Sequence, residues 1–461
     1  MANSYATHSA TTPTNAKKFT ISFWAKRAKL NADQQILGFE TDSNNKLFCW
    51  FNASNQIDFI NKSSNSTTMR LKTTKTFLDT AAWYHIVLAV DTTDNTSTDR
   101  LKLYVNGSRH LSANNGYASE TYPSADATAS VGGTHIIGAD HNGGSQQYFY
   151  EGALTHIHYT DGYVYTPSTF GETDSTSGIW KPNPSPSGVT YGTNGFFLKF
   201  ENNAALGTDS SGQSNTFTVS GNLKQLLDSP SNSYANLSPL YTIEYNSAHF
   251  FTNQNNTTNE NQTQWNTNPC THAVTKGKWY FEGYGHTNGS HYVHYGITSQ
   301  AKMNANSTQA QAEINTNSNG YAYGYYGTNG SIYYSTPSSS TSTSYGNSYG
   351  STDYIGIFVD LDNNKLYFAK NGTLQNSGTG YDIHADGKPY LLTTAVYNGL
   401  TNVNFGNGLF GTTALTGTTY ADANGDGIFK YSPNQGGAAN FDSTAKNFYA
   451  MNTKNLEEFG G

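Results

Sequence analysis

The sequence predicts an all-β protein built of two antiparallel β-sandwiches in series, the first a jelly roll, with a packed connector between them. Aromatic residues make up 14% of the 461 residues, whereas charged residues make up only 12%. Disordered chains are poor in aromatic residues, so a folded chain is expected. Tyrosine and threonine favour pleated, half-buried surfaces, and the 34 tyrosines and 45 glycines therefore indicate strands joined by turns.

The charge and apolar patterns argue against two classes of partner. The net charge is −7 and the basic residues are scattered, whereas nucleic-acid-binding proteins carry a basic patch or stripe. No apolar run approaches 18 residues, so no membrane insertion is expected. Cys49 and Cys270 lie far apart and are expected to be free core residues.

Short strands dominate residues 1–165. Phe19, Ile21 and Phe23 alternate with polar residues, which predicts a half-buried strand. Residues 101–105 alternate and lead into Asn106-Gly107, a strong hairpin signal. Short strands separated by turns predict a sandwich or barrel. Further strands are expected at residues 46–51, 83–90, 134–138 and 153–159.

The order of these features resembles the concanavalin-A-like, laminin-G-type jelly rolls. Residues 19–24 are similar to their opening strand, residues 83–86 and 103–107 to their central pair, and residues 136–138 and 149–159 to their closing strands. This resemblance assigns residues 1–165 to the first domain. Members of the superfamily bind sugars, cleave glucans or serve only as structural modules.

Hydrolysis is not expected, and neither is a cofactor. Retaining glycosidases need two carboxylates about 5–5.5 Å apart. The glucanase branch of the superfamily carries a Glu-x-Asp-x-x-Glu type strand, which this sequence lacks. Glu40 and Asp42 are two residues apart but lie where a strand runs into a turn, and Glu151 is isolated. The chain is therefore predicted not to be an enzyme.

His156 and His158 are the candidate metal ligands of the first domain. They flank Ile157 in a predicted strand, so both imidazoles should lie on one face. Two such imidazoles can begin a site for zinc, copper, iron or nickel, which three strands around a symmetry axis would complete. The alternative is that both are polar, outward-facing residues at a half-exposed strand edge.

Residues 166–232 are predicted to form a structured connector. Phe170 and Trp180 should anchor it on a sandwich, and its prolines should keep the backbone extended. Phe196 begins an alternating run that should add a strand at residues 195–201. A connector that packs in this way fits a rigid rod better than a tether.

The connector also resembles a recurrent module of bacteriophage virion proteins. In those proteins the module joins a laminin-G-type domain to a SPRY-like domain, commonly in tail fibres or other surface appendages. The resemblance implies a place on the virion exterior. It is carried by Asp161-Gly162, Phe170-Gly171-Glu172, Trp180-Lys181-Pro182, Tyr191-Gly192-Thr193-Asn194-Gly195-Phe196, Asp209-Ser210-Ser211-Gly212 and Asp228-Ser229-Pro230.

Residues 233–415 resemble a SPRY domain. Residues 276–282 are similar to the start of its core, residues 354–360 should pair with 365–370 across a turn, and residues 388–390 and 403–406 match the closing strands. SPRY domains bind through loops and are not known for catalysis, so this half implies recognition or scaffolding. The remaining residues 416–461 are expected to pack on the second domain or on a partner subunit.

Four tyrosines are the candidate binding residues of the second domain. A tyrosine ring is apolar and carries a hydroxyl, which suits sugar stacking and interfaces. Many of the tyrosines from 321 to 334 are also expected in paired strands, where their role is structural. Residues 337–350 are expected to form a variable surface loop. The candidates are Tyr325, Tyr326, Tyr345 and Tyr349.

Together these features predict a non-enzymatic bacteriophage structural protein, a tail fibre or surface appendage that binds host-surface carbohydrate or a receptor. One alternative is a capsid decoration or head-fibre protein that binds other virion proteins. Another alternative is a glycan depolymerase. A homo-oligomer is expected, and other phage fibres suggest a trimer by analogy.

Overall fold

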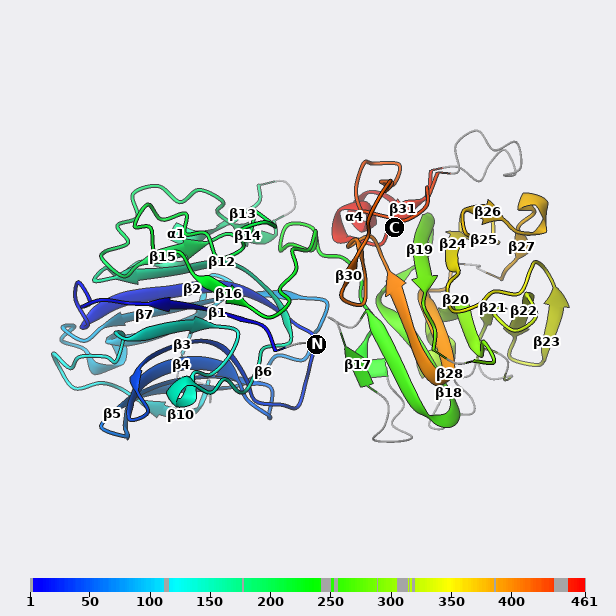
Figure 1. Cartoon of the computed structure of the whole chain (residues 1–461). Coiled ribbons are helices and arrows are strands. Elements are labelled where there is room, and N and C mark those ends of the chain that lie inside the picture. The colour runs from blue at the N-terminus through cyan, green and yellow to red at the C-terminus, as the bar shows by residue number, and fades with distance from the viewer. Residues whose placement is uncertain are drawn as a thin grey trace. The chain divides into compact units, whose positions relative to one another are not determined.

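The computed structural model describes residues 3–111, 116–175, 178–241, 250–252, 256–287, 289–304, 314, 316, 320–384, 387–434 and 447–460. The chain divides into two compact units, Met1–Gln225 and Leu226–Gly461 (Figure 1). Both are built almost wholly of antiparallel strands, as the sequence predicts. In the described part of the chain, no helix is long and apolar enough to cross a membrane.

The first unit is a sandwich of two sheets. The eight-stranded sheet has the order β10 (Tyr117–Thr121), β6 (Ser66–Thr76), β5 (Gln56–Ser63), β4 (Asn45–Phe51), β3 (Gln34–Asp42), β11 (Thr134–Ile137), β1 (Tyr5–Ser9) and β16 (Thr218–Ser220). The six-stranded sheet has the order β15 (Phe196–Leu198), β12 (Gly152–Asp161), β2 (Lys18–Arg27), β7 (Trp83–Asp91), β8 (Leu101–Val105) and β9 (Ser108–His110).

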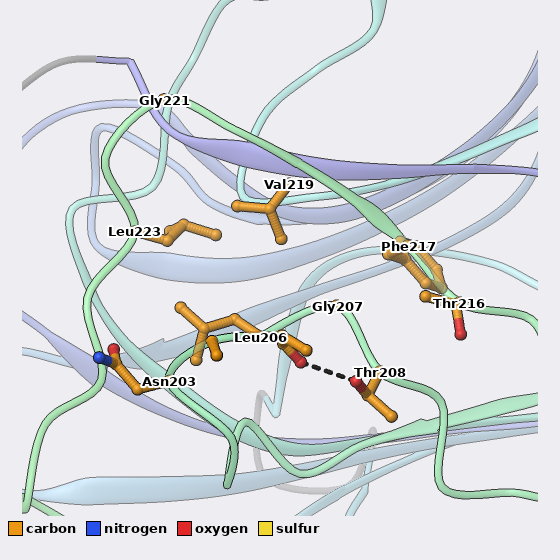
Figure 2. A pocket seen from close by; sticks show the side chains of 11 residues that line it. Asn203, Leu206, Gly207, Thr208, Thr216, Phe217, Val219, Gly221 and Leu223 are labelled. Atoms are coloured by element: carbon orange, nitrogen blue, oxygen red, sulfur yellow. Dashed lines mark hydrogen bonds between the residues drawn. The ribbon is translucent and has the colours of Figure 1, made fainter.

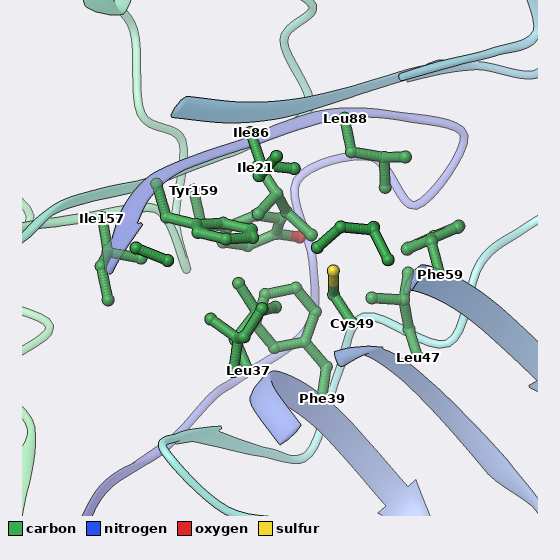
Figure 3. Packing of buried hydrophobic residues seen from close by; sticks show 14 of the residues in the cluster. Ile21, Leu37, Phe39, Leu47, Cys49, Phe59, Ile86, Leu88, Ile157 and Tyr159 are labelled. Carbon is green, nitrogen blue, oxygen red and sulfur yellow. The ribbon is translucent and has the colours of Figure 1, made fainter. Parts of the chain in front are cut away.

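The core of this unit lies between the two sheets. Alternate residues of facing strands meet there, among them Ile21 and Ile86 from one sheet and Phe39 from the other (Figure 3). Cys49 is buried in the same cluster, and Cys270 is buried in the second unit. Both are free thiols, so the expectation from the sequence is confirmed.

Residues 166–225 of the predicted connector fold into the first unit. Besides α1 (Pro167–Phe170) and the hairpin of β13 (Gly171–Thr173) and β14 (Trp180–Pro182), they supply β15 to one sheet and β16 to the other. The Asp209 carboxylate accepts hydrogen bonds from the backbone N–H groups of Phe197, Ser211 and Asn215. The Asp-Ser-Ser-Gly motif therefore holds the backbone of residues 197–215 in a fixed conformation.

The second unit is organised around two long paired strands, β18 (Thr257–Val274) and β28 (Tyr390–Asn404). One part of β28 pairs with β20 and another part with β19, so that both layers are joined in one sheet. The order is β23 (Ser340–Ser344), β22 (Ser331–Ser335), β21 (Ala322–Tyr326), β20 (Val293–Ser299), β28, β19 (Lys278–Tyr284), β24 (Tyr354–Asp360), β25 (Lys365–Lys370) and β26 (Thr373–Leu374).

Shorter elements complete this unit. The expectation of a loop over residues 337–350 is wrong in part, because Ser340–Ser344 pairs with β22 as the edge strand β23. Serine and threonine can follow a strand edge as readily as a loop. The remaining strands and α-helices are β17 (Phe250–Thr252), α2 (Gln300–Asn304), β27 (Tyr381–Asp382), β29 (Leu409–Phe410), β30 (Thr413–Ala414), β31 (Tyr449–Ala450) and α4 (Thr453–Phe459).

The C-terminal segment packs on the second unit. Phe429 and Phe448 cover an outer face of β19, β24 and β25, where they bury Tyr280, Phe358 and Tyr367. A buried carboxylate fixes this segment, since Asp422 Oδ2 accepts hydrogen bonds from the backbone N–H of Ala450 and from Asn455 Nδ2. One outer face of the sheet is thereby closed.

Candidate functional site

A cluster of aromatic side chains lies on the other outer face of the second unit. We call it the aromatic platform. Its rings come from β18, β20, β21, β22 and β28 and from the residue preceding β20. The platform consists of Trp265, Tyr292, His294, Tyr326, Tyr333 and Tyr397.

Strand register brings these residues onto one face. Trp265 stands opposite Tyr397 in the β18–β28 pair, and His294 stands opposite Tyr326 in the β20–β21 pair. Because successive side chains of a strand alternate between faces, all four point away from the core. Gly324 keeps the floor of the platform low, since a Cβ there would lie 3.0 Å from the Cβ of His294.

The rings touch one another in a continuous array. Trp265 lies at its centre, with ring centroids 4.8 Å from His294, 5.9 Å from Tyr326 and 5.8 Å from Tyr397. Tyr326 stacks on His294 at 4.5 Å and meets Tyr333 edge-on at 5.0 Å. Such mutual packing fixes the ring orientations before any ligand arrives.

The platform is partly open, unlike the aromatic face under the C-terminal segment. Tyr280, Phe358 and Tyr367 are fully buried there. By contrast, Trp265 and all four tyrosines of the platform are only half-buried, although Ile314 packs beside Trp265 and Tyr333. The second unit thus keeps one aromatic face covered and one accessible.

The platform is electrically neutral. None of its members is an aspartate, glutamate, lysine or arginine. Burial lowers the pKa of His294 to about 3, so its imidazole is uncharged near neutral pH. The residues that alternate onto the same face are small or uncharged: Thr267, Gly296, Gly324, Ser331 and Ala395. The surface offers flat apolar rings with hydroxyl groups at their edges.

Of the four tyrosines predicted to bind a ligand, only Tyr326 belongs to the platform. Tyr325, Tyr345 and Tyr349 lie in the core, and each hydroxyl donates to a backbone carbonyl: Asn347, Thr379 and Val293, respectively. Tyr325 and Tyr326 are adjacent in β21, so alternation sends them to opposite faces. A ligand could stack on the three buried rings only if they left the core. The structure therefore does not place Tyr325, Tyr345 and Tyr349 where the predicted ligand binding needs them.

His156 and His158 are covered rather than exposed at a strand edge. A β-bulge interrupts the pairing of β12 with β2 between Thr155 and His158, and His156 has a φ of 46°. His158 is fully buried, with its ring 3.8 Å from that of Phe197 and its Nδ1 2.9 Å from the Tyr191 hydroxyl. Within the described residues, no group of three histidine, cysteine or carboxylate side chains is placed to hold a metal ion.

Connector side chains provide this cover. Phe170 is buried against His158, and Phe196 is buried in the core of the first unit. Trp180 packs on Gly171, where a Cβ would lie 2.6 Å from the indole, and its Nε1 donates to His85 Nδ1 at 2.9 Å. These three residues have architectural positions.

The first unit also has a pocket of about 330 Å³ beside β16, in which Leu206, Val219 and Leu223 gather on one side (Figure 2). No titratable side chain lines it. Its size is near the lower limit of small-molecule sites. The aromatic platform is therefore the stronger candidate site.

The sequence did not identify the other members of the platform as binding residues: Trp265, Tyr292, His294, Tyr333 and Tyr397. Trp265 and Tyr397 are more than 100 residues apart in the sequence. Only the pairing register of β18, β20 and β28 brings these residues together. The available signal was the spacing of Tyr292 and His294, two residues apart at the start of a strand.

Comparisons with known proteins match each unit separately. Residues 1–164 match the family described as the concanavalin A-like lectin/glucanases superfamily (Laminin_G_3), and residues 278–407 match the SPRY domain family. No curated protein matches the chain.

Similar solved structures are distant. The SPRY domain of human HERC1 aligns at 13% identity with a TM-score of 0.29, over 36% of this chain and 96% of that one. A putative carbohydrate binding protein from Bacteroides ovatus aligns at 13% identity with a TM-score of 0.34, over 48% of this chain and 56% of that one. This chain therefore spans just over half the length of the Bacteroides protein.

Proposed function

Because the chain carries a concanavalin A-like/laminin G-type domain followed by a SPRY domain, we propose that it is a non-enzymatic protein that binds a glycan on the aromatic platform. Sugar rings present flat apolar faces edged by hydroxyl groups. The platform presents the complementary surface, in which preformed aromatic faces carry hydroxyl groups at their edges. This match of apolar faces and hydroxyl edges is the main support for glycan binding.

The electrostatics of the platform favour an uncharged glycan. Removing an anionic group from water without a cation beside it is costly. The platform and its flanking strand positions contain no lysine or arginine. A neutral sugar would lose only hydroxyl hydration, which the tyrosine hydroxyls can replace.

We further propose that the chain is part of a bacteriophage virion, as a tail fibre or other exterior appendage. The motifs of residues 159–239 that resemble the phage connector module support this proposal. Other virion proteins are then its partners, with host-surface glycan or a receptor as the target. A homo-oligomer is in keeping with such a role.

The binding proposal is tested by applying the purified full chain to an array of neutral and charged glycans. We expect saturable binding to neutral glycans, weakened by Tyr326→Ala and by Tyr397→Ala. Tyr420→Ala is the matched control, because Tyr420 is an exposed tyrosine of the same unit outside the platform. No binding to any glycan, or equal loss in all three variants, would overturn the proposal.

The proposed location and the absence of catalysis need separate measurements. Antibody labelling of intact particles should mark the tail. Labelling of the capsid instead would favour the decoration alternative. Incubation of the chain with the bound glycan should release no reducing sugar, and release would identify a depolymerase.

A further inference from the structure

A second surface that combines aromatic rings with basic side chains lies on the first unit, on the outer face of its eight-stranded sheet. We call it the basic aromatic surface. Alternation along β4, β5 and β6 turns its strand residues away from the core, and the loop before β12 adds one ring. It consists of Lys46, Phe48, Trp50, Lys62, Arg70, Lys72 and Tyr148.

Three rings form the centre of this surface. Trp50 is half-buried and meets Phe48 edge-on at 5.3 Å and Tyr148 edge-on at 5.8 Å between centroids. Tyr148 is a large aromatic side chain that is 43% exposed. The ring array is therefore accessible from solvent.

The backbone at Tyr148 is strained. Its φ of 50° lies in the left-handed region, which a bulky residue rarely adopts. Its carbonyl accepts a hydrogen bond from the backbone N–H of Gln35 at 2.8 Å, which holds the loop against the sheet. Strain of this kind occurs in clusters at active sites and ligand clamps, which makes Tyr148 a candidate contact residue. The exposed ring is thus held in place at an energetic cost.

Four cations lie on this face, and two of them form ion pairs with carboxylates of the same unit. Lys46 stands directly opposite Lys62 in the β4–β5 pair, and like charges in that position destabilise a sheet. Arg70 is engaged by Asp58 at 3.0 and 2.7 Å, and Lys46 lies 3.8 Å from Asp140. Among the described residues, no carboxylate lies within ion-pair distance of Lys62 or Lys72.

We propose that the basic aromatic surface binds an anionic polysaccharide, one whose sugar units carry carboxylate or sulfate groups. The rings of Trp50 and Tyr148 would stack on sugar faces, while Lys62 and Lys72 pair with the anionic substituents. Flexible lysines suit a polymer whose charges recur at varying positions, because an ammonium group places no planar constraint on its partner. The site is separate from the neutral platform of the second unit.

The test is electrophoresis of the full chain through native gels that contain alginate, dextran sulfate or uncharged dextran. We expect retardation by one or both anionic polymers and none by dextran at this surface. Alginate and dextran sulfate distinguish carboxylate from sulfate recognition. Added salt should reduce the retardation by the anionic polymers, because it screens the attraction between exposed charges.

Variants assign the binding to this surface. Trp50→Ala and the pair Lys62→Gln/Lys72→Gln should each abolish retardation by the anionic polymer, whereas the platform variant Tyr326→Ala should leave it unchanged. Lys75→Gln/Lys224→Gln is the charge-matched control, because it removes two exposed lysines outside the surface. Circular dichroism checks that each variant is folded.

Several results would overturn the proposal. These are no retardation by either anionic polymer, retardation by dextran that depends on Trp50, or equal loss in the charge-matched control. A change in sedimentation of Trp50→Ala with no change in retardation would identify the surface as a contact between copies of the chain, which also contradicts polysaccharide binding.

Discussion

Tyr325 and Tyr326 are neighbours in β21 with opposite environments. Tyr325 is fully buried and stacks at 4.9 Å on Phe368, whereas Tyr326 is half-buried on the platform. Two adjacent tyrosines therefore have different roles, one in stability and one in the proposed binding. Residue type alone does not separate them, and only the direction of the side chain does.

Alanine substitutions of this pair should separate stability from binding. Tyr325→Ala is expected to lower the free energy of unfolding by about 3–5 kcal/mol, as for other large aromatic side chains in a core. Tyr326→Ala should lower it by no more than about 1 kcal/mol. Urea unfolding of both variants checks this, and similar losses in the two would contradict the assignment of faces.

Glu282 is a buried carboxylate that ties the C-terminal segment to β19. It accepts hydrogen bonds from the backbone N–H groups of Lys430 and Tyr431, from Asn404 Nδ2 and from the Tyr280 hydroxyl. Burial raises the pKa of Glu282 from 4.5 to about 7, against the opposing effect of these donors. The carboxyl group therefore titrates in the folded protein close to neutral pH.

This raised pKa predicts a loss of stability with rising pH. The folded state binds the Glu282 proton more tightly than the unfolded state does. Its contribution to the free energy of unfolding is therefore complete below about pH 4.5 and is lost as the pH rises through about 7. Between about pH 5 and pH 8 the loss should be about 2–3 kcal/mol. Urea unfolding of the wild type against Glu282→Gln isolates this contribution, and parallel pH profiles for the two proteins would refute it.

At the level of elements, the hairpin of β13 and β14 covers His85, one of three buried histidines held neutral in the first unit. Trp180 donates to His85, whose Nε2 lies 2.8 Å from the Ser22 hydroxyl. Burial lowers the pKa of His85 to about 3, the pKa of His156 to about 4 and the pKa of His158 well below its usual range. The Trp180 hydrogen bond requires an unprotonated Nδ1 on His85, so the packed hairpin and the neutral state of His85 depend on each other.

The first unit should accordingly lose stability in acid. A histidine whose pKa is lowered in the folded state binds a proton only on unfolding. Each such histidine lowers the free energy of unfolding by about 1.4 kcal/mol per pH unit as the pH falls from about 6.5 toward its folded pKa. His85→Gln offers a similar acceptor and donor without titrating. It should reduce the proton uptake on unfolding by about one between about pH 6 and pH 4.

The measurement is the slope of unfolding free energy against pH for the wild type and His85→Gln. An unchanged slope would mean that His85 is not held neutral by the folded structure. The same scan follows the near-ultraviolet signal of the tryptophans, which reports whether Trp180 leaves its place as the pH falls.

Strands were predictable from the sequence where one local pattern decides them. Alternation at Phe19, Ile21 and Phe23 and the Asn106-Gly107 turn gave β2 and the β8–β9 hairpin. The bulge at His156 was not predictable, because it depends on pairing with β2 and β15. The platform was predictable only at Tyr326, since the register between distant strands sets the rest.

At the scale of the whole molecule, the chain has two different aromatic surfaces, one on each unit. The platform is uncharged, whereas the surface around Trp50 carries four cations. The connector residues in the first unit belong to its framework, with Asp209 and Trp180 fixed by hydrogen bonds. Binding should therefore be sought on the sheet faces of the two units and not in the connector.

The proposed binding of an uncharged glycan to the aromatic platform can be measured in solution. The most direct measurement is isothermal titration calorimetry of the best neutral glycan against the wild type, Tyr326→Ala and Tyr420→Ala. Loss of a stacking ring should weaken binding by about tenfold, roughly 1.4 kcal/mol, in Tyr326→Ala and leave Tyr420→Ala unchanged. Equal affinity of Tyr326→Ala and the wild type would contradict binding on the platform.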